Sequence, residues 1–171
     1  MDSIRALIRE IPDYPKPGIL FYDITPVLGD GPAFRELLDR MVEPHQDQGI
    51  TKVAGIEARG FTLAAPIARM LGAGFIPVRK PGKLPHKTKA RKYDLEYGSD
   101  ALEVHIDAAS EGDRILIVDD LLATGGTAAA AVGLFDEMGG HVVGLSVFIE
   151  LTFLKGRDRL GDLPFHALLE Y

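Results

Sequence analysis

Two adjacent carboxylates stand directly before a glycine-containing turn. Asp119 and Asp120 follow the apolar run of residues 115–118, and the turn that comes next contains Ala123, Thr124, Gly125, Gly126 and Thr127. Glycines let a ligand approach the backbone closely, and the amide groups and dipole of a following helix favour a bound anion. The spacing therefore predicts a phosphate cradle formed by residues 123–127.

The two carboxylates indicate a ligand that is more than a phosphate group. Carboxylates repel phosphate, but they accept hydrogen bonds from vicinal hydroxyls and can lie near a magnesium ion. A ribose phosphate therefore fits Asp119 and Asp120 better than phosphate alone. The glycine spacing matches neither a dinucleotide fingerprint nor a P-loop. An ordinary strand–turn–helix connection with capping Thr and Asp side chains stays open as the alternative.

Basic residues that could bind further anions lie in two other segments. Arg59 follows a predicted strand, where its guanidinium can bind a diphosphate by paired hydrogen bonds and Gly60 permits a close approach. Residues 79–92 hold seven of the nineteen Lys and Arg residues and no acid, which is typical of a positive lid over a phosphorylated substrate. A solvated arginine and a solvated basic loop are the plainer interpretations of the two segments.

The spacing of apolar residues predicts the elements that position these groups. Apolar positions recur at helical spacing in residues 32–42, and short apolar runs then alternate with helical stretches. Pro66 is compatible with a helix only near its start or at a kink. Residues 93–97 and 102–106 form a hairpin that extends from the main sheet, with its turn at 98–100. The remaining predicted elements are strands at 52–57, 74–78, 114–118 and 142–149 and helices at 62–71 and 127–138.

Composition limits the class of protein. A length of 171 residues predicts one domain, here an α/β domain with a parallel sheet flanked by helices. The net charge of -6 disfavours nonspecific binding to nucleic acid. The chain has no cysteine, no apolar stretch long enough for a membrane helix and no secretory pattern, so we expect a cytoplasmic protein without membrane contact. The five scattered histidines lack paired ligand spacing, which predicts no metal site built by the protein itself.

Four segments resemble the type I phosphoribosyltransferases, and together they resemble the adenine branch of that family. They are residues 17–26 (PGILFYDITP), 55–61 (GIEARGF), 79–85 (RKPGKLP) leading to 95–98 (LEYG), and 118–127 (VDDLLATGGT). The resemblance spans nearly the whole chain. It implies a phosphoribosyltransferase-like fold over residues 1–171, with an N-terminal hood at residues 1–30 and a flexible lid and hairpin at residues 79–106.

The resemblance also implies roles for the residues that bind the sugar diphosphate. Asp119 and Asp120 hold the ribose hydroxyls, and the cradle holds the 5′-phosphate. Arg59 binds diphosphate beside a non-proline cis peptide, expected at Ala58–Arg59. Arg79 and Lys83 match positions that contact the diphosphate, often from a neighbouring subunit, which implies a homodimer. Magnesium arrives mainly with the diphosphate.

A further group of residues is implied at the purine base. Phe21 stacks on the purine, Leu121 presses from the opposite side, and backbone groups around Ile24 read the adenine edge. Glu96 aids proton transfer, and Tyr97 orients the leaving group. Phe21 and Leu121 would otherwise be ordinary core residues. The family commonly has Arg where this chain has Tyr22, so a side-chain contact at that position is not carried over.

The implied reaction is a step of purine salvage. Adenine and 5-phospho-α-D-ribose 1-diphosphate (PRPP) give AMP and diphosphate, through a transition state that resembles an oxocarbenium ion. Two other functions stay open at this point. One is a noncatalytic regulator that binds PRPP as an effector, and the other is a related enzyme acting on xanthine or orotate.

Overall fold

The computed structural model describes residues 2–94 and 99–171, which form one compact unit up to Arg40 and a second, Met41–Tyr171. The first unit contains α1 (Asp2–Leu7), β1 (Arg9–Ile11), β2 (Phe21–Asp23), α2 (Thr25–Gly29) and most of α3 (Gly31–Val42). β1 and β2 pair antiparallel, with Arg9 opposite Asp23. The helix predicted at 32–42 is confirmed, and it begins one residue earlier because Asp30 Oδ1 accepts a hydrogen bond from the Ala33 amide at 2.9 Å.

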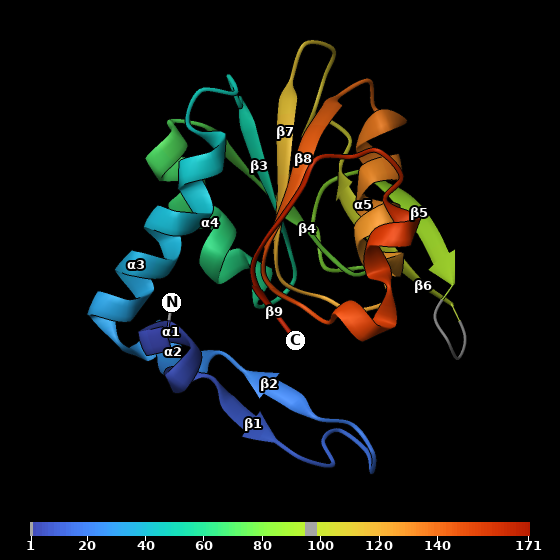
Figure 1. The fold of residues 1–171 in the computed structure, drawn as a ribbon. Coiled ribbons are helices and arrows are strands. Elements are labelled where there is room, and N and C mark those ends of the chain that lie inside the picture. Colours follow the sequence, from blue (N-terminus) through green and yellow to red (C-terminus); the bar gives the residue numbers. More distant parts are fainter. Residues whose placement is uncertain (1, 95–98) are drawn as a thin grey trace. The chain divides into compact units, whose positions relative to one another are not determined.

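The second unit is built on a five-stranded parallel sheet (Figure 1). Its strands are β3 (Lys52–Ile56), β4 (Gly74–Val78), β7 (Arg114–Leu122), β8 (His141–Glu150) and β9 (Phe165–Glu170). They lie in the order β4-β3-β7-β8-β9. The predicted parallel sheet flanked by helices is therefore confirmed, and β9 is a strand that the sequence patterns did not predict.

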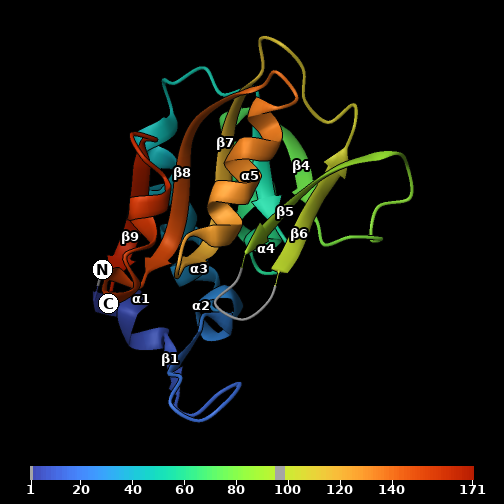
Figure 2. The same cartoon turned by 90° about the vertical axis from the view of Figure 1, so that its right-hand side faces the viewer.

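The order of the strands places a crevice at one edge of this sheet. The chain steps outward from β3 to β4 through α4 (Gly60–Leu71), and in the opposite direction from β7 to β8 through α5 (Gly126–Asp136). Because such crossovers are right-handed, the two helices cover opposite faces of the sheet, as Figure 2 shows. Ligands of open α/β sheets bind where the strand order reverses, which is here at the carboxyl ends of β3 and β7.

A separate hairpin lies beside α5. β5 (Thr88–Asp94) pairs antiparallel with β6 (Ser99–His105), and one bridge between Arg79 and Glu103 joins the hairpin to the end of β4. The hairpin is confirmed, but the predicted turn at residues 98–100 is wrong for Ser99 and Asp100. These residues continue β6, because they pair with Asp94 and Tyr93.

Apolar side chains from three layers meet in one core. Ile56, Val78, Ile115 and Ile117 of the sheet are almost completely buried, and they belong to one cluster with Leu134 and Phe135 of α5 and Leu102 and Val104 of β6. β8 is buried from its second residue to its last, as expected of a strand covered on both faces. Burial on this scale makes the sheet a rigid platform for the residues at its carboxyl edge.

Two predicted elements differ in extent for identifiable reasons. β7 runs to Leu122 rather than ending at 118, because Asp119, Leu121 and Leu122 continue to pair with β8. Pro66 lies in the interior of α4 rather than at its start. Leu63 and Ile67, which are fully buried on either side of the proline, hold the helix on the sheet despite the missing amide.

The remaining elements are short 3₁₀ helices: η1 (Glu43–His45), η2 (Thr152–Leu154) and η3 (Gly156–Arg159). Within the ranges 2–94 and 99–171, no helix has the length and apolar character needed to cross a bilayer.

Candidate active site

The two predicted carboxylates lie side by side at the carboxyl end of β7. Asp120 is 6% exposed and Asp119 is half-buried, and the Asp120 amide donates to Asp119 Oδ1 at 2.9 Å. Asp120 Oδ2 forms an ion pair with Arg59 Nε at 2.7 Å. This buried oxygen accepts no hydrogen bond from the residues that the structure describes. It is therefore an acceptor suited to a ligand hydroxyl.

The surroundings of Asp119 disfavour its negative charge. Burial, and then the neighbouring charge of Asp120, raise the pKa of the Asp119 carboxyl well above its usual range. A Cβ atom on Gly60 would lie 2.7 Å from Asp119 Oδ1. Gly60 thus permits the first turn of α4 to approach this carboxylate, whereas the sequence reasoning had assigned its close approach to a ligand.

The predicted phosphate cradle forms a small hollow between β7 and α5. The hollow has a volume of about 90 Å³ and is lined by Asp119 and Leu121 together with all five predicted cradle residues, Ala123, Thr124, Gly125, Gly126 and Thr127. Gly125 has φ of +79° and precedes α5 without a side-chain cap. The amide groups of the first turn of α5 consequently face this space without a capping side chain, which favours an anion.

Gly156 supports the cradle from behind, and the sequence reasoning did not single it out. A Cβ atom on Gly125 would lie 2.3 Å from the Gly156 carbonyl oxygen, and one on Gly156 would lie 2.3 Å from the Ala123 carbonyl oxygen. The two backbones therefore touch without a side chain between them. The only signal in the sequence was an isolated glycine between Lys155 and Arg157.

A larger hollow, of about 430 Å³, adjoins the cradle and shares Asp119, Leu121 and Thr127 with it. Arg59 and Asp120 also line this hollow, so five of the predicted site residues meet there. The structure adds polar groups that had no predicted role, namely Glu57, Lys80, Tyr93 and Asp100.

Three of these added residues form one polar cluster. Lys80 Nζ lies 2.7 Å from Asp100 Oδ2, and the Tyr93 hydroxyl donates to the same oxygen at 3.3 Å. Tyr93 and Thr127 line the same hollow, and burial is the main cause that raises the pKa of Tyr93. The cluster thus places the β5–β6 hairpin beside the first turn of α5.

The other two residues predicted to bind diphosphate are Arg79, which directly follows β4, and Lys83, a few residues further along the chain. Neither residue lines either of the two hollows. Arg79 Nε donates to Glu57 Oε2 at 2.8 Å, and Arg79 Nη1 donates to the Lys83 carbonyl at 3.1 Å. The Lys83 side chain is exposed. Their part in diphosphate binding stays a prediction.

Much of the basic segment is not the open loop that its charge suggested. From Thr88 onward the segment is β5. Lys89 Nζ donates to the Glu137 carbonyl at 2.7 Å, and Arg91 forms an ion pair with the Glu137 carboxylate. These two cations lie at the carboxyl end of α5, which has negative dipole character, so they dock the hairpin.

Two of the predicted base-binding residues, Phe21 and Ile24, belong to the first unit, whereas Leu121 lines both hollows of the second. Phe21 in β2 is half-buried and packs edge-to-face on Tyr14, with ring centroids 5.1 Å apart. Ile24 is fully buried, and its carbonyl accepts the Val27 amide at 3.0 Å in the first turn of α2. Purine stacking and edge recognition stay predictions for these residues.

The predicted cis peptide follows β3, and its place differs by one residue from the prediction. A non-proline cis peptide is present, but at Glu57–Ala58 and not at Ala58–Arg59. The Glu57 amide still donates to the Val78 carbonyl at 3.0 Å, so the chain leaves the sheet immediately after Glu57. Glu96 and Tyr97, the predicted proton-transfer and orienting residues, lie outside the described residues.

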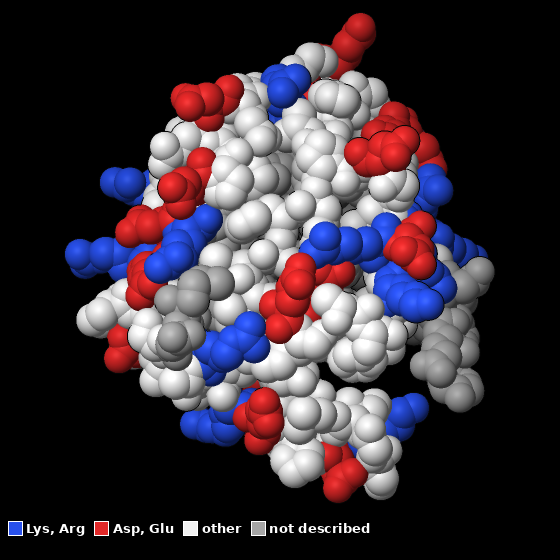
Figure 3. Space-filling view, viewed as in Figure 1, with Lys and Arg blue, Asp and Glu red and all other residues white. Residues whose placement is uncertain are grey.

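Charges of both signs are mixed on the surface. On the face drawn in Figure 3, Lys and Arg side chains stand next to Asp and Glu side chains. Within the described parts of the chain, no group of three or more acidic or histidine side chains could hold a metal ion.

Comparisons with known proteins agree with this geometry. Residues 28–162 match the phosphoribosyl transferase domain family. Adenine phosphoribosyltransferase from Thermobifida fusca is 57% identical over 96% of this chain and 94% of its own length. The chain belongs to the adenine phosphoribosyltransferase family.

Solved structures of the family superpose closely on this chain. The adenine phosphoribosyltransferase of Rhodothermus marinus has a TM-score of 0.96 and 53% identity, covering 99% of this chain and 97% of that one. The enzyme of Saccharomyces cerevisiae, solved with adenine and an imino-altritol bisphosphate, has a TM-score of 0.92 and 37% identity over 98% and 97% of the two chains. The resemblance deduced from four short segments therefore extends over the whole fold.

Proposed function

We propose that this protein catalyses purine salvage by transferring the 5-phosphoribosyl group of PRPP to N9 of adenine, which gives AMP and diphosphate. It is a pentosyl-transferring glycosyltransferase. The observation that carries the proposal is the adjacency of an uncapped helix amino end to the neighbouring carboxylates of Asp119 and Asp120, because a phosphorylated sugar needs both.

The two hollows divide the sugar diphosphate between them. The 5′-phosphate lies in the cradle of residues 123–127, and the ribose hydroxyls donate to Asp119 and Asp120. The diphosphate lies in the larger hollow, where Arg59 is the predicted donor. Arg59 exchanges its ion pair with Asp120 for the incoming anion, since a guanidinium binds phosphate oxygens by paired hydrogen bonds.

Magnesium enters with the diphosphate. Asp119 and Asp120 are the carboxylates that would hold it, and their oxygens are ligands of the kind that magnesium prefers. Asp120 Oδ2, which is paired with Arg59 in the structure, would accept either this ion or a ribose hydroxyl once Arg59 turns to the diphosphate. A bound magnesium ion would neutralise the charge that develops on the leaving diphosphate.

The base and its proton are assigned to Phe21 and Ile24 of the hood, to Leu121 of β7, and to Glu96 and Tyr97. Phe21 and Leu121 hold the purine between them, and backbone groups around Ile24 distinguish adenine from an oxo-purine. Glu96 assists proton transfer on the purine, and Tyr97 orients the leaving group. Residues 1–30 serve as the hood, and residues 79–106 serve as the lid.

The protein functions as a cytoplasmic homodimer, with adenine, PRPP, AMP and diphosphate as its small-molecule partners. Arg79 and Lys83 support the dimer, because both are basic residues outside the hollows of their own chain and can supply the site of a second copy.

Product formation with different bases tests the proposal. The protein is incubated with PRPP, magnesium and one of adenine, hypoxanthine, xanthine or orotate, and nucleotide and diphosphate are quantified. We expect AMP from adenine and little product from the other bases. A preferred oxo-purine or orotate would overturn the choice of base, and an absence of product with every base would favour a PRPP-binding regulator.

A further inference from the structure

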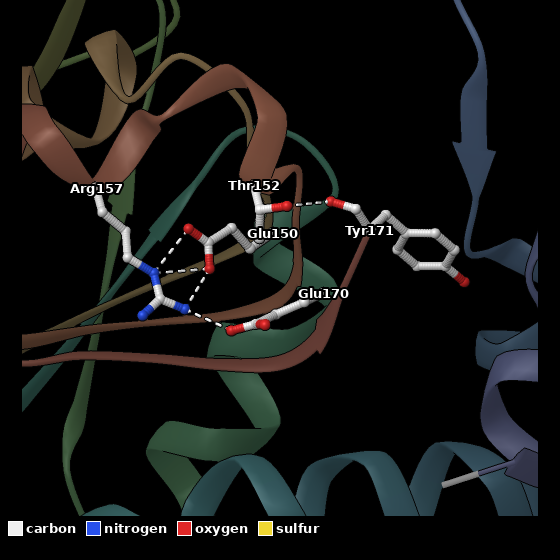
Figure 4. A network of polar contacts seen from close by, with 5 residues as sticks. All are labelled: Glu150, Thr152, Arg157, Glu170 and Tyr171. Atoms are coloured by element: carbon white, nitrogen blue, oxygen red, sulfur yellow. Dashed lines mark hydrogen bonds and ion pairs between the residues drawn. The ribbon is translucent and has the colours of Figure 1, made fainter.

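An arginine that pairs with neither Asp119 nor Asp120 fixes the segment that supports the phosphate cradle. Arg157, in η3, directly follows Gly156, whose backbone lies against Ala123 and Gly125. The Arg157 guanidinium points towards Glu150 and Glu170, the last residues of β8 and β9 (Figure 4).

Two strands supply the acceptors for this guanidinium. Arg157 Nε lies 2.7 Å from both carboxylate oxygens of Glu150, and Nη2 contacts Glu150 as well. Nη2 also donates to Glu170 Oε1 at 2.8 Å. The Arg157 guanidinium carbon lies 4.5 Å from the centre of the Phe165 ring, so a cation–π contact completes the set.

Glu150 is the anchor of this network. It is the last residue of β8 and is 2% exposed. A carboxylate with so little access to water needs a paired cation, and the guanidinium supplies one in a fixed planar geometry. Glu150 also pairs with Leu122 of β7, the residue that enters the cradle. The network therefore ties η3 to the same strand edge from which the cradle starts.

The backbone of Gly156 is packed tightly against the backbone of the cradle. Both glycine backbones are so close that neither tolerates a Cβ atom. A displacement of η3 must therefore either press on the cradle or leave it unsupported. The amide groups of the cradle need a fixed geometry to bind phosphate, since a site that is loose by about 1 Å loses much of its effect.

We propose that Arg157 is a positioning residue for the phosphate cradle, which it acts on by holding Gly156 in place through Glu150 and Glu170. The proposal rests on the proposed function in one respect, that the cradle receives the 5′-phosphate. It predicts that disruption of the network weakens the binding of the phosphorylated sugar and leaves the binding of adenine unchanged.

The test compares Arg157→Met with Arg159→Met, a matched control in the same 3₁₀ helix. No ion pair or hydrogen bond of the Arg159 side chain is present within the described chain. Because Arg157→Met alone leaves Glu150 buried without a partner, the double variant Glu150→Gln/Arg157→Met removes that charge as well and keeps the test valid if the single variant fails to fold. Arg157→Lys retains the charge without the paired geometry.

Two measurements are made on each variant: the affinity for ribose 5-phosphate by titration calorimetry, and the KM values for PRPP and adenine. We expect Arg157→Met and the double variant to lose about tenfold or more in ribose 5-phosphate affinity, with a similar rise in KM for PRPP and little change in KM for adenine. Arg157→Lys should recover part of the loss, and Arg159→Met should match the parent protein.

Unchanged ribose 5-phosphate affinity in the folded double variant would overturn the proposal, as would equal losses for PRPP and adenine. The calorimetric measurement does not depend on catalysis. A parent protein that binds ribose 5-phosphate but makes no AMP would therefore contradict the proposed function and leave the test of Arg157 intact.

Discussion

Asp119 combines a binding role with a cost to stability. Its pKa is raised by burial and by Asp120, so the folded state holds the proton more tightly than the unfolded state. The contribution of Asp119 to stability is then greatest at low pH and falls as the pH rises from about 4, the ordinary aspartate value, towards the raised pKa. A carboxylate kept under these conditions is typical of a functional site.

We expect Asp119→Asn to be more stable than the parent protein at pH 7, by about 1 kcal/mol, and to lose about ten- to a hundredfold in kcat/KM for PRPP. The amide removes the disfavoured charge, and its oxygen can still accept the Asp120 amide. Urea unfolding at several pH values between 4 and 8 measures the first effect, and the difference between the variants should grow with pH. Asp47→Asn, at an exposed position, should show neither change. A destabilised Asp119→Asn at pH 7 would contradict this reasoning.

Among the elements, α5 offers two glycine positions for comparison, the N-cap Gly125 and the interior Gly133. Gly125 at its start has φ of +79° and faces the Gly156 backbone. The nearest atoms to a Cβ on Gly133, in the helix interior, belong to the guanidinium of Arg91, the end of a long and flexible side chain. The two positions therefore form a matched pair for the same substitution.

We expect Gly125→Ala to cost at least about 2 kcal/mol, because the left-handed conformation and the backbone contact both oppose a Cβ atom. Gly133→Ala should stay within about 1 kcal/mol of the parent protein. It gains helix propensity, about 1 kcal/mol, and loses at most an exposed ion pair of similar size between Arg91 and Glu137. Chemical denaturation measures both. A Gly125→Ala variant as stable as Gly133→Ala would show that the cradle does not need its tight contact with η3.

The elements that could be predicted from sequence are those whose apolar spacing is undisturbed. The helix of residues 31–42 and the strands at 52–56 and 74–78 were placed within one residue. The end of β7 was missed because two carboxylates interrupt its apolar run, and the start of β5 at Thr88 was missed because its charged side chains resemble a solvated loop. At the end of β7 the residue types serve the site, and in β5 they serve the docking on α5. In neither strand do they follow the apolar alternation of a strand.

A pair of histidines, the buried His45 and the half-buried His166, joins η1 to β9, outside the site. The rings of His45 and His166 have centroids 6.0 Å apart. Burial lowers the pKa of both, and His166 lowers that of His45 further, against a hydrogen bond from His45 to Gln48 that raises it. As the pH is lowered, these histidines take up protons in the unfolded state before they do so in the folded state. Their contribution to stability therefore falls as the pH drops below about 6.5.

We expect His45→Gln to reduce this loss of stability at acidic pH. The loss should amount to about 1.4 kcal/mol for each pKa unit that separates the folded and unfolded states. Free energies of unfolding at pH 7.5 and pH 5.5 give the comparison, with His141→Gln, at an exposed histidine, as the control. An equal acid sensitivity in His45→Gln and His141→Gln would show that the pair does not titrate on unfolding.

At the scale of the whole molecule, the sequence predicted more site residues than the two hollows of one chain bring together. The cradle, both aspartates and Arg59 line the two hollows of the second unit. Phe21 and Ile24 belong to the first unit, while Arg79 and Lys83 line neither hollow. Short motifs identify ligand-binding residues through the chemistry they need, but they do not state which copy of the chain uses them. That information requires an assembly.

Mixed dimers test whether Lys83 acts on the site of a neighbouring subunit. Lys83→Ala and Asp119→Asn should each be nearly inactive, because one lacks a diphosphate contact and the other a ribose contact. If Lys83 acts across the interface, a hybrid dimer has one site with both residues intact and one with neither. Refolding the two variants together in equal amounts makes about half of the dimers hybrids, so the mixture should recover roughly a quarter of the parent activity. If Lys83 acts within its own chain, every site of the hybrid carries one defect and mixing restores nothing.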